Sequence, residues 1–276
     1  MGTVVTAIIS IAAIGAVCAV ILSFASKFMA VKVDERILNI QECLPGTNCG
    51  ACGYPGCSGY AEALASGEAK NNLCTPGGAE SAKKISAILG VENTDFEIEE
   101  KTAVVRCRGD LSSQQKKMDY KGIETCVAAK QIFGGERACA FGCLGYGDCK
   151  NICPSDAVCI EDGLAKINQN CTSCGLCVKA CPNKLISIEK KSLSAVVLCK
   201  NIERGAVVRK KCSSGCIACG KCVRECQYGA IKLEDNLAVI DYEKCMDCGH
   251  CAEICVTKCI GDTLHENYRT GNYITT

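Results

Sequence analysis

The chain has 276 residues and 28 of them are cysteine, whereas it contains five phenylalanines, eight tyrosines and no tryptophan. Its net charge is +1, so no strong overall field favours nucleic acid, and no nucleic-acid partner is expected. So many cysteines with so little aromatic material indicate that bound metal replaces part of a hydrophobic core, and the length allows about two domains.

The first predicted element is an uncharged apolar segment, Val4 to Ser26. At about 1.5 Å per residue it can span a hydrocarbon core of roughly 30 Å, which predicts one transmembrane helix within residues 1–30. No lysine or arginine precedes it, unlike the start of a secretory signal peptide. Lys27, Lys32 and Arg36 follow it and predict a single-pass protein of the cell (inner) membrane with its cysteine-rich domains in the cytoplasm. Thiols stay reduced there, as labile clusters require.

A glycine-rich loop with cysteines follows, in a predicted small domain at residues 31–92. Cys49, Cys52 and Cys57 lie in the motif CGACGYPGC, and Cys74 follows a short helical stretch that Gly67 can end. The glycines let the backbone turn tightly around a cluster. Four thiolates in this arrangement predict a [4Fe-4S] site. Zinc is the alternative, because a C-x-x-C pair with two distant cysteines can also bind zinc.

An internal repeat dominates the rest of the chain. Residues 79–89 are expected to form an amphipathic helix and residues 95–105 a strand. From there on, cysteines recur at a spacing of 73 or 74 residues, as Cys126 with Cys199 and Cys181 with Cys255 illustrate. The repeat predicts an α+β fold with two tandem bacterial-type 2[4Fe-4S] ferredoxin-like modules, at residues 93–192 and 193–276.

The second module has the complete ligand pattern of a bacterial ferredoxin, with two runs of closely spaced cysteines. In two-cluster ferredoxins the last cysteine of each run binds the other cluster. We therefore predict one [4Fe-4S] cluster on Cys216, Cys219, Cys222 and Cys255, and another on Cys226, Cys245, Cys248 and Cys251. Zinc is a weaker alternative here, because a third closely spaced cysteine has no place in a tetrahedral zinc site.

The first module departs from this pattern at one position, because Tyr146 stands where the second module has Cys219. Cys139 is the nearest substitute in the sequence. The predicted ligand sets are therefore Cys139, Cys143, Cys149 and Cys181 for one cluster, and Cys153, Cys171, Cys174 and Cys177 for the other.

Besides Cys18, inside the apolar segment, and Cys43, which is expected to be a free thiol, six cysteines remain unassigned: Cys107, Cys126, Cys159, Cys199, Cys212 and Cys259. Two of these positions are repeated between the modules: Cys126 of the first corresponds to Cys199 of the second, and Cys139 corresponds to Cys212. An extra cluster on Cys107, Cys126, Cys199 and Cys212 is therefore one hypothesis, and buried free thiols are the other. The sequence predicts at least five [4Fe-4S] clusters, and six if this set also binds one.

The order of these motifs resembles the B subunit of the Rnf complex, a membrane-bound ferredoxin:NAD+ oxidoreductase. The resemblance covers nearly the whole chain and rests on the apolar N-terminal segment, the C-GA-C-GYPG-C motif with its distal C-TPGG, and the tandem ferredoxin motifs. It implies an electron-transfer subunit that passes single electrons from soluble ferredoxin to other Rnf subunits. There, NAD+ reduction is coupled to Na+ or H+ translocation.

The sequence shows no nucleotide-binding fingerprint, Walker loop or acid–base pair of its own. NAD and flavin are therefore expected on partner subunits, and no catalytic residue is expected besides the cluster ligands. The second module is expected to receive electrons and the Cys49 site to release them. Two other functions stay open: a polyferredoxin subunit of another membrane-bound reductase or hydrogenase, which the Cys49 motif disfavours, and a metal-storage protein, which the ordered repeat disfavours.

Overall fold

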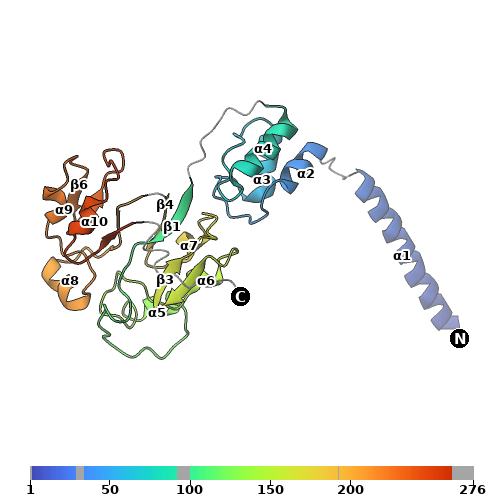
Figure 1. The fold of residues 1–276 in the computed structure, drawn as a ribbon. Helices are drawn as coiled ribbons and strands as arrows, with labels where there is room; N and C mark the ends of the chain where they lie inside the picture. Colours follow the sequence, from blue (N-terminus) through green and yellow to red (C-terminus); the bar gives the residue numbers. More distant parts are fainter. Residues whose placement is uncertain (1, 29–33, 92–99, 192, 263–276) are drawn as a thin grey trace, which may run out of the picture.

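The computed structural model describes residues 2–28, 34–91, 100–191 and 193–262. The domain boundaries predicted at residues 30, 92 and 192 therefore lie outside the described residues. A long helix, α1 (Gly2–Phe28), begins the chain, and large apolar side chains along it are exposed, Ile9, Ile21 and Phe24 among them (Figure 1). In the parts of the chain that the structure describes, no helix combines the length and apolar character needed to cross a membrane.

Three helices form a small domain between α1 and the rest of the chain (Figure 1). They are α2 (Glu35–Glu42), α3 (Gly56–Ala65) and α4 (Gly78–Leu89), so the two helices expected near residues 58–67 and 79–89 are present. Ile40, Tyr60, Leu64 and Ile85 are completely or almost completely buried between them. The Tyr60 hydroxyl donates to the carbonyl of Lys70 at 2.6 Å, which fixes the loop that leads to Cys74.

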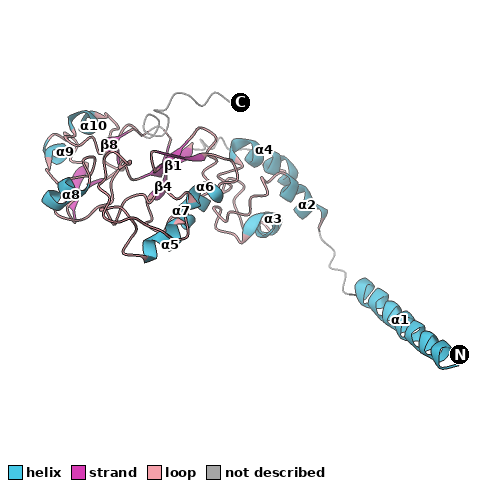
Figure 2. Cartoon of the chain, turned by 90° about the horizontal axis from the view of Figure 1, so that it is seen from below, coloured by secondary structure: helices cyan, strands magenta, loops and turns pink. Residues whose placement is uncertain are grey.

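The remainder consists of short strands and helices joined by loops, which make up most of its length (Figure 2). Its first half contains the antiparallel hairpin of β2 (Val158–Glu161) and β3 (Leu164–Ile167). Its second half contains the hairpin of β6 (Ile231–Glu234) and β7 (Leu237–Ile240). Val158 pairs with Ile167 and Ile231 with Ile240, so the two hairpins occupy equivalent positions in the sequence repeat.

A second strand pair joins the beginning and end of each half. In the first half β1 (Lys101–Val105) pairs with β4 (Ile186–Lys190), and in the second half β5 (Val196–Val197) pairs with β8 (Ile260–Gly261). Of the strand expected over residues 95–105, residues 95–99 lie outside the described part. These pairs and hairpins give the two halves the same antiparallel plan, in agreement with the predicted α+β composition.

Among the residues that the structure describes, six short helices complete the two halves. They are α5 (Cys126–Gln131), α6 (Asp148–Asn151) and α7 (Leu176–Ala180) in the first, and α8 (Gly205–Lys211), α9 (Lys221–Arg224) and α10 (His250–Ile254) in the second. The pair α6 and α7 corresponds to α9 and α10 in the repeat, and each of these helices follows a cysteine loop. The repeat of the sequence is therefore also a repeat of structure.

Cysteines form much of both cores. The core of the first half includes Ile167, Leu185 and Ile186 together with Cys143, Cys149 and Cys177. That of the second half includes Ile231 and Ile240 together with Cys199, Cys216 and Cys222. A small apolar cluster of Val104, Leu193, Val196 and Leu198, against which Tyr242 packs, joins the two halves. Cysteine sulfur thus takes the place of the aromatic side chains that the sequence lacks.

Candidate iron–sulfur sites

All 28 cysteines lie among the described residues, and each is a free thiol without a disulfide partner. Within that part of the chain, no three His, Cys, Asp or Glu side chains stand close enough together to hold a single metal ion. The thiolates of a [4Fe-4S] cluster bind four different irons and need not converge on one point. The cysteine groups below are therefore compared with the requirements of a cluster.

The loop before α3 gathers the four cysteines of the small domain. Burial raises the pKa of the Cys74 thiol, and nearby Cys57, Cys52 and Cys49 raise it further. The Asn48 side chain closes the loop by accepting a hydrogen bond from the Cys57 backbone N–H at 2.8 Å. The structure thus brings together the four cysteines that the sequence assigns to one site.

Gly56 is required in this loop for two reasons. Its φ of 87° lies in the left-handed region, and a Cβ at this position would lie 2.8 Å from the Oδ1 atom of Asn48. A larger residue would therefore displace the side chain that holds Cys57 in place.

In the second half the structure brings together both predicted cysteine sets. Burial raises the pKa of Cys222 to about 11, with contributions from nearby Cys216, Cys255 and Cys219. The other four, Cys226, Cys245, Cys248 and Cys251, line one cavity of about 190 Å³.

In the first half the structure also brings together one of the two predicted sets, Cys153, Cys171, Cys174 and Cys177. Burial raises the pKa of Cys177 to about 12, and nearby Cys171, Cys174 and Cys153 contribute. Backbone N–H groups point at these sulfurs, since Ala157 donates to Cys153 at 3.3 Å and Ala103 to Cys171 at 3.4 Å. Such N–H···S bonds suit a thiolate that binds a cluster.

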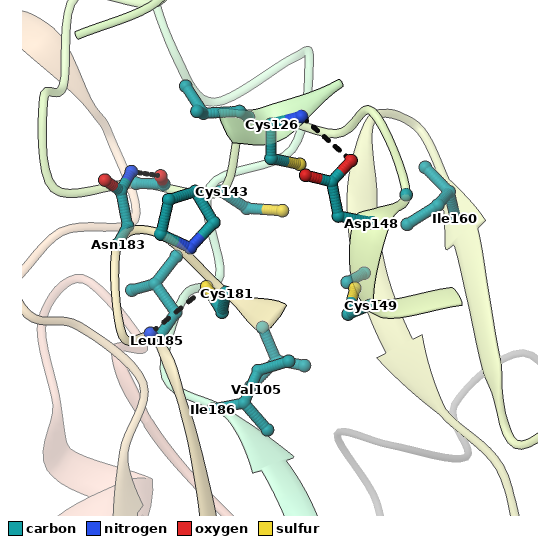
Figure 3. Close-up of a pocket in the computed structure, with 15 residues that line it drawn as sticks. Val105, Cys126, Cys143, Asp148, Cys149, Ile160, Cys181, Asn183, Leu185 and Ile186 are labelled. Carbon is teal, nitrogen blue, oxygen red and sulfur yellow. Dashed lines mark hydrogen bonds between the residues drawn. The ribbon is translucent and has the colours of Figure 1, made fainter. Parts of the chain in front are cut away.

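The other site of the first half differs from the set predicted from the sequence, which was Cys139, Cys143, Cys149 and Cys181. One cavity is lined by Cys126, Cys143, Cys149 and Cys181, and Cys139 does not line it (Figure 3). Cys126 begins α5, and the Asp148 carboxylate fixes that end of the helix by accepting hydrogen bonds from the backbone N–H groups of Cys126 and Val127 at 3.0 and 3.1 Å. The structure therefore places Cys126, and not Cys139, beside the other three cysteines.

Tyr146 stands in the cysteine loop of the first half, at the position where the second half has Cys219. Gly145 and Gly147 on either side of it have φ values of 82° and 83°, in the same left-handed region as Ala218 and Gly220 around Cys219. The loop backbone thus keeps the conformation of the complete run. The Tyr146 ring packs edge-on against Tyr120 at 5.7 Å between ring centroids.

Cys139 lies in a different cavity, which it lines together with Cys107, Cys199 and Cys212. Cys126 and Cys139 have thus exchanged places relative to the sequence-based prediction. Sequence distance favoured Cys139 for the Cys143 site, but the contact between Asp148 and α5 that brings in Cys126 joins segments about twenty residues apart. No local sequence motif predicts the contact between Asp148 and α5.

Two unassigned cysteines make other contacts. The Cys159 sulfur lies 3.7 Å from the Lys166 carbonyl oxygen and 3.9 Å from the Glu161 carboxylate, so its S–H can donate to either. The sulfur of Cys259 lies 3.7 Å from that of Cys255. Cys159 therefore stands apart from the cysteine groups, whereas Cys259 borders one of them.

Three family models match the chain at these groups. Residues 44–76 match the model described as "Putative Fe-S cluster", residues 165–187 match a "4Fe-4S binding domain", and residues 215–259 match a "4Fe-4S dicluster domain". The matches cover part of the small domain and part of each half. They identify the chain as an iron–sulfur protein with [4Fe-4S]-binding domains.

Relatives match over nearly the whole chain, and each is the B subunit of an oxidoreductase complex. The chain is 40% identical to that of the Na(+)-translocating ferredoxin:NAD(+) oxidoreductase complex of Acetobacterium woodii, over 92% of this chain and 76% of the relative. It is 40% identical to that of the ion-translocating oxidoreductase complex of Methanosarcina acetivorans, over 93% of this chain and 97% of the relative. It is 38% identical to that of the proton-translocating ferredoxin:NAD(+) oxidoreductase complex of Clostridium ljungdahlii, over 94% and 91%. The chain therefore belongs to the B-subunit family of the ion-translocating oxidoreductase (Rnf) complexes.

Proposed function

We propose that this subunit relays single electrons from reduced ferredoxin through a series of [4Fe-4S] clusters toward NAD+ reduction that is coupled to ion translocation. The observation that carries the proposal is the set of separate four-cysteine groups along one chain. The names of the relatives support the donor and the acceptor, since they specify ferredoxin:NAD(+) oxidoreductases that translocate Na+ or protons. When bound, the clusters supply one-electron redox chemistry, and the chain's own residues hold them and set their potentials.

Five ligand sets follow from the grouping of the cysteines. Four are those expected from the sequence, and in the fifth Cys126 takes the place of Cys139. The sets are Cys49, Cys52, Cys57 and Cys74; Cys126, Cys143, Cys149 and Cys181; Cys153, Cys171, Cys174 and Cys177; Cys216, Cys219, Cys222 and Cys255; and Cys226, Cys245, Cys248 and Cys251.

Contacts between neighbouring groups support a continuous route. Cys149 and Cys177, which belong to different sets, interact electrostatically in the first half. Cys222 and Cys251 do the same in the second half. The Lys179 ammonium group donates to the Cys49 carbonyl at 2.9 Å, which ties the small domain to the helix that carries Cys177. These contacts link neighbouring sets within each half and join the first half to the Cys49 site.

The proposal includes a membrane anchor in the N-terminal segment, which rests on the sequence alone. The absence of charge from Val4 to Ser26 supports it. The basic residues after this segment favour a cytoplasmic location for the cysteine-rich part. NAD and flavin would bind to partner subunits of the complex.

The Cys49 site provides a direct test of the relay. Membranes that contain the complete complex with Cys57→Ala should lose ferredoxin-dependent NAD+ reduction to the background level, because this substitution removes one thiolate of the last site in the route. Reduction is followed by NADH absorbance. Cys43→Ala, in the same domain but outside the ligand set, is the matched control and should retain activity. Undiminished NAD+ reduction in Cys57→Ala membranes that lack the EPR signal of this cluster would remove it from the route.

A further inference from the structure

We propose that Cys107, Cys139, Cys199 and Cys212 bind a sixth [4Fe-4S] cluster between the two halves of the molecule. The four cysteines line one small cavity of about 20 Å³. The cavity of the Cys126 site has the same volume, about 20 Å³. The relay role of this cluster depends on the proposed function, whereas its presence does not.

Each half of the molecule contributes two of the four ligands. Cys107 follows β1 and Cys139 precedes α6 in the first half, while Cys199 follows β5 and Cys212 follows α8 in the second. Cys139, Cys199 and Cys212 are all buried, at 6%, 8% and 7% exposed. A cluster here would therefore be shielded from water and would link the two halves covalently.

The hydrogen bonds at these sulfurs are those of thiolate ligands. Cys107 accepts from the backbone N–H of Cys143 at 3.4 Å. Asn201, itself buried, donates its backbone N–H to Cys199 at 3.5 Å and its side-chain amide to Cys139 at 3.4 Å. Three sulfurs from three segments thus accept N–H groups, the pattern also found at the Cys153 and Cys171 sulfurs.

Backbone contacts between the halves hold the fourth ligand in place. The Gln115 N–H donates to the Lys211 carbonyl at 3.1 Å, and the Ser213 N–H donates to the Ser113 carbonyl at 3.0 Å. These two bonds lie on either side of Cys212 in the second half and join it to the segment that follows Cys107.

A buried positive charge is hydrogen-bonded to the wall of this cavity and suits an anionic cluster here or at the neighbouring Cys143 site. Arg137 is 4% exposed, and its guanidinium donates to the carbonyls of Gly109 and Gly163. Among the described residues, no carboxylate forms an ion pair with it. Gly109 lines the cavity, and Arg137 also acts electrostatically on Cys143 of the neighbouring site. A buried cation is costly without an opposite charge, and a cluster with four thiolates is an anion.

The iron content of the full-length protein, purified anaerobically with its clusters, tests the proposal. At four irons per cluster we expect about 24 iron atoms and as many acid-labile sulfides per chain, against about 20 without this cluster. The double variant Cys107→Ala/Cys199→Ala should lose about four irons and one EPR signal after dithionite reduction. Cys159→Ala, which removes a partly buried thiol outside the groups, should lose none. About 20 irons in the native chain, or zinc in place of the missing iron, would overturn the proposal.

Combining substitutions tests the ligand set itself. Adding Cys139→Ala to the double variant should cause no further loss of iron, because all three residues belong to one cluster. Adding Cys126→Ala should disturb a second cluster and remove more iron or change its EPR signal. If instead Cys139→Ala causes the further loss and Cys126→Ala does not, the sequence-based ligand set is right and this one is wrong. Because these readouts need no activity, they stand even if the electron route is different.

Discussion

At the level of single residues, Cys259 is an extra thiol beside a proposed cluster. It is 2% exposed, and its sulfur lies 3.7 Å from that of Cys255 and also interacts with Cys216. The equivalent residue in the first half is Leu185, four residues after Cys181 as Cys259 is four after Cys255. If Cys216 and Cys255 bind iron as thiolates, the Cys259 thiol can donate a hydrogen bond to one of them.

Removing this hydrogen-bond donor should lower the reduction potential of the Cys216 cluster. Donors to cluster sulfurs favour the reduced state, and one bond of about 1 kcal/mol corresponds to roughly 40 mV for one electron. We therefore expect a downward shift of this size in Cys259→Ala and a smaller shift in Cys259→Ser, measured by EPR-monitored redox titration. Cys159→Ala is the control. Equal potentials in the native protein and in Cys259→Ala would show that Cys259 only fills space.

The residue scale also shows what the sequence could predict about the sites. Short-range spacing was sufficient to predict which cysteines lie together around Cys57, Cys177, Cys222 and Cys251, because three members of each group lie on one loop or on one loop and its helix. It failed for Cys126, because the contact of Asp148 with α5 depends on tertiary folding. It also could not place Cys199 and Cys212 beside Cys107, since that grouping needs both halves packed together.

At the level of elements, the contact between α7 and the Cys49 loop carries the proposed route out of the ferredoxin-like part. The Lys179 ammonium group donates to the Cys49 carbonyl at 2.9 Å, and Lys179 lies two residues after Cys177. This single bond therefore joins two neighbouring ligand sets.

Lys179→Ala should slow electron transfer without removing clusters. Loss of a bond of about 1 kcal/mol lowers the docked population of the small domain by up to roughly fivefold, and ferredoxin-dependent NAD+ reduction should fall in proportion. Iron content should be unchanged. Lys150→Ala is the matched control, because it removes a lysine from α6, the other short helix of the first half that follows a cysteine loop. A rate equal to that of the native complex would show that the contact does not limit the transfer.

The local sequence predicts the hairpin turns and one helix, but it does not predict how β1 is paired. The hairpin turns at Asp162–Gly163 and Asp235–Asn236 have positive φ at both residues, and Asp-Gly or Asp-Asn is typical of such turns. The helix at residues 79–89 was expected from its apolar spacing and is present as α4. In contrast, β1 pairs with β4 about eighty residues later, and no local pattern specifies that partner.

At the level of the whole molecule, the family resemblance expected from the order of motifs is confirmed by the relatives. The small domain with its four cysteines, followed by two ferredoxin-like halves, is matched over more than nine-tenths of this chain. The tandem halves pack through Val104, Val196 and Leu198 and share the cavity of Cys107. The membrane anchor and its orientation stay predictions of the sequence.

The order in which the clusters become reduced tests the relay most directly. The complete complex is mixed with reduced ferredoxin in the absence of NAD+, frozen after successive intervals and examined by EPR, with Cys57→Ala used to assign the signal of the Cys49 site. The account predicts that clusters of the second half are reduced first and the Cys49 cluster last. Reduction of the Cys49 cluster before those of the second half would contradict the proposed route.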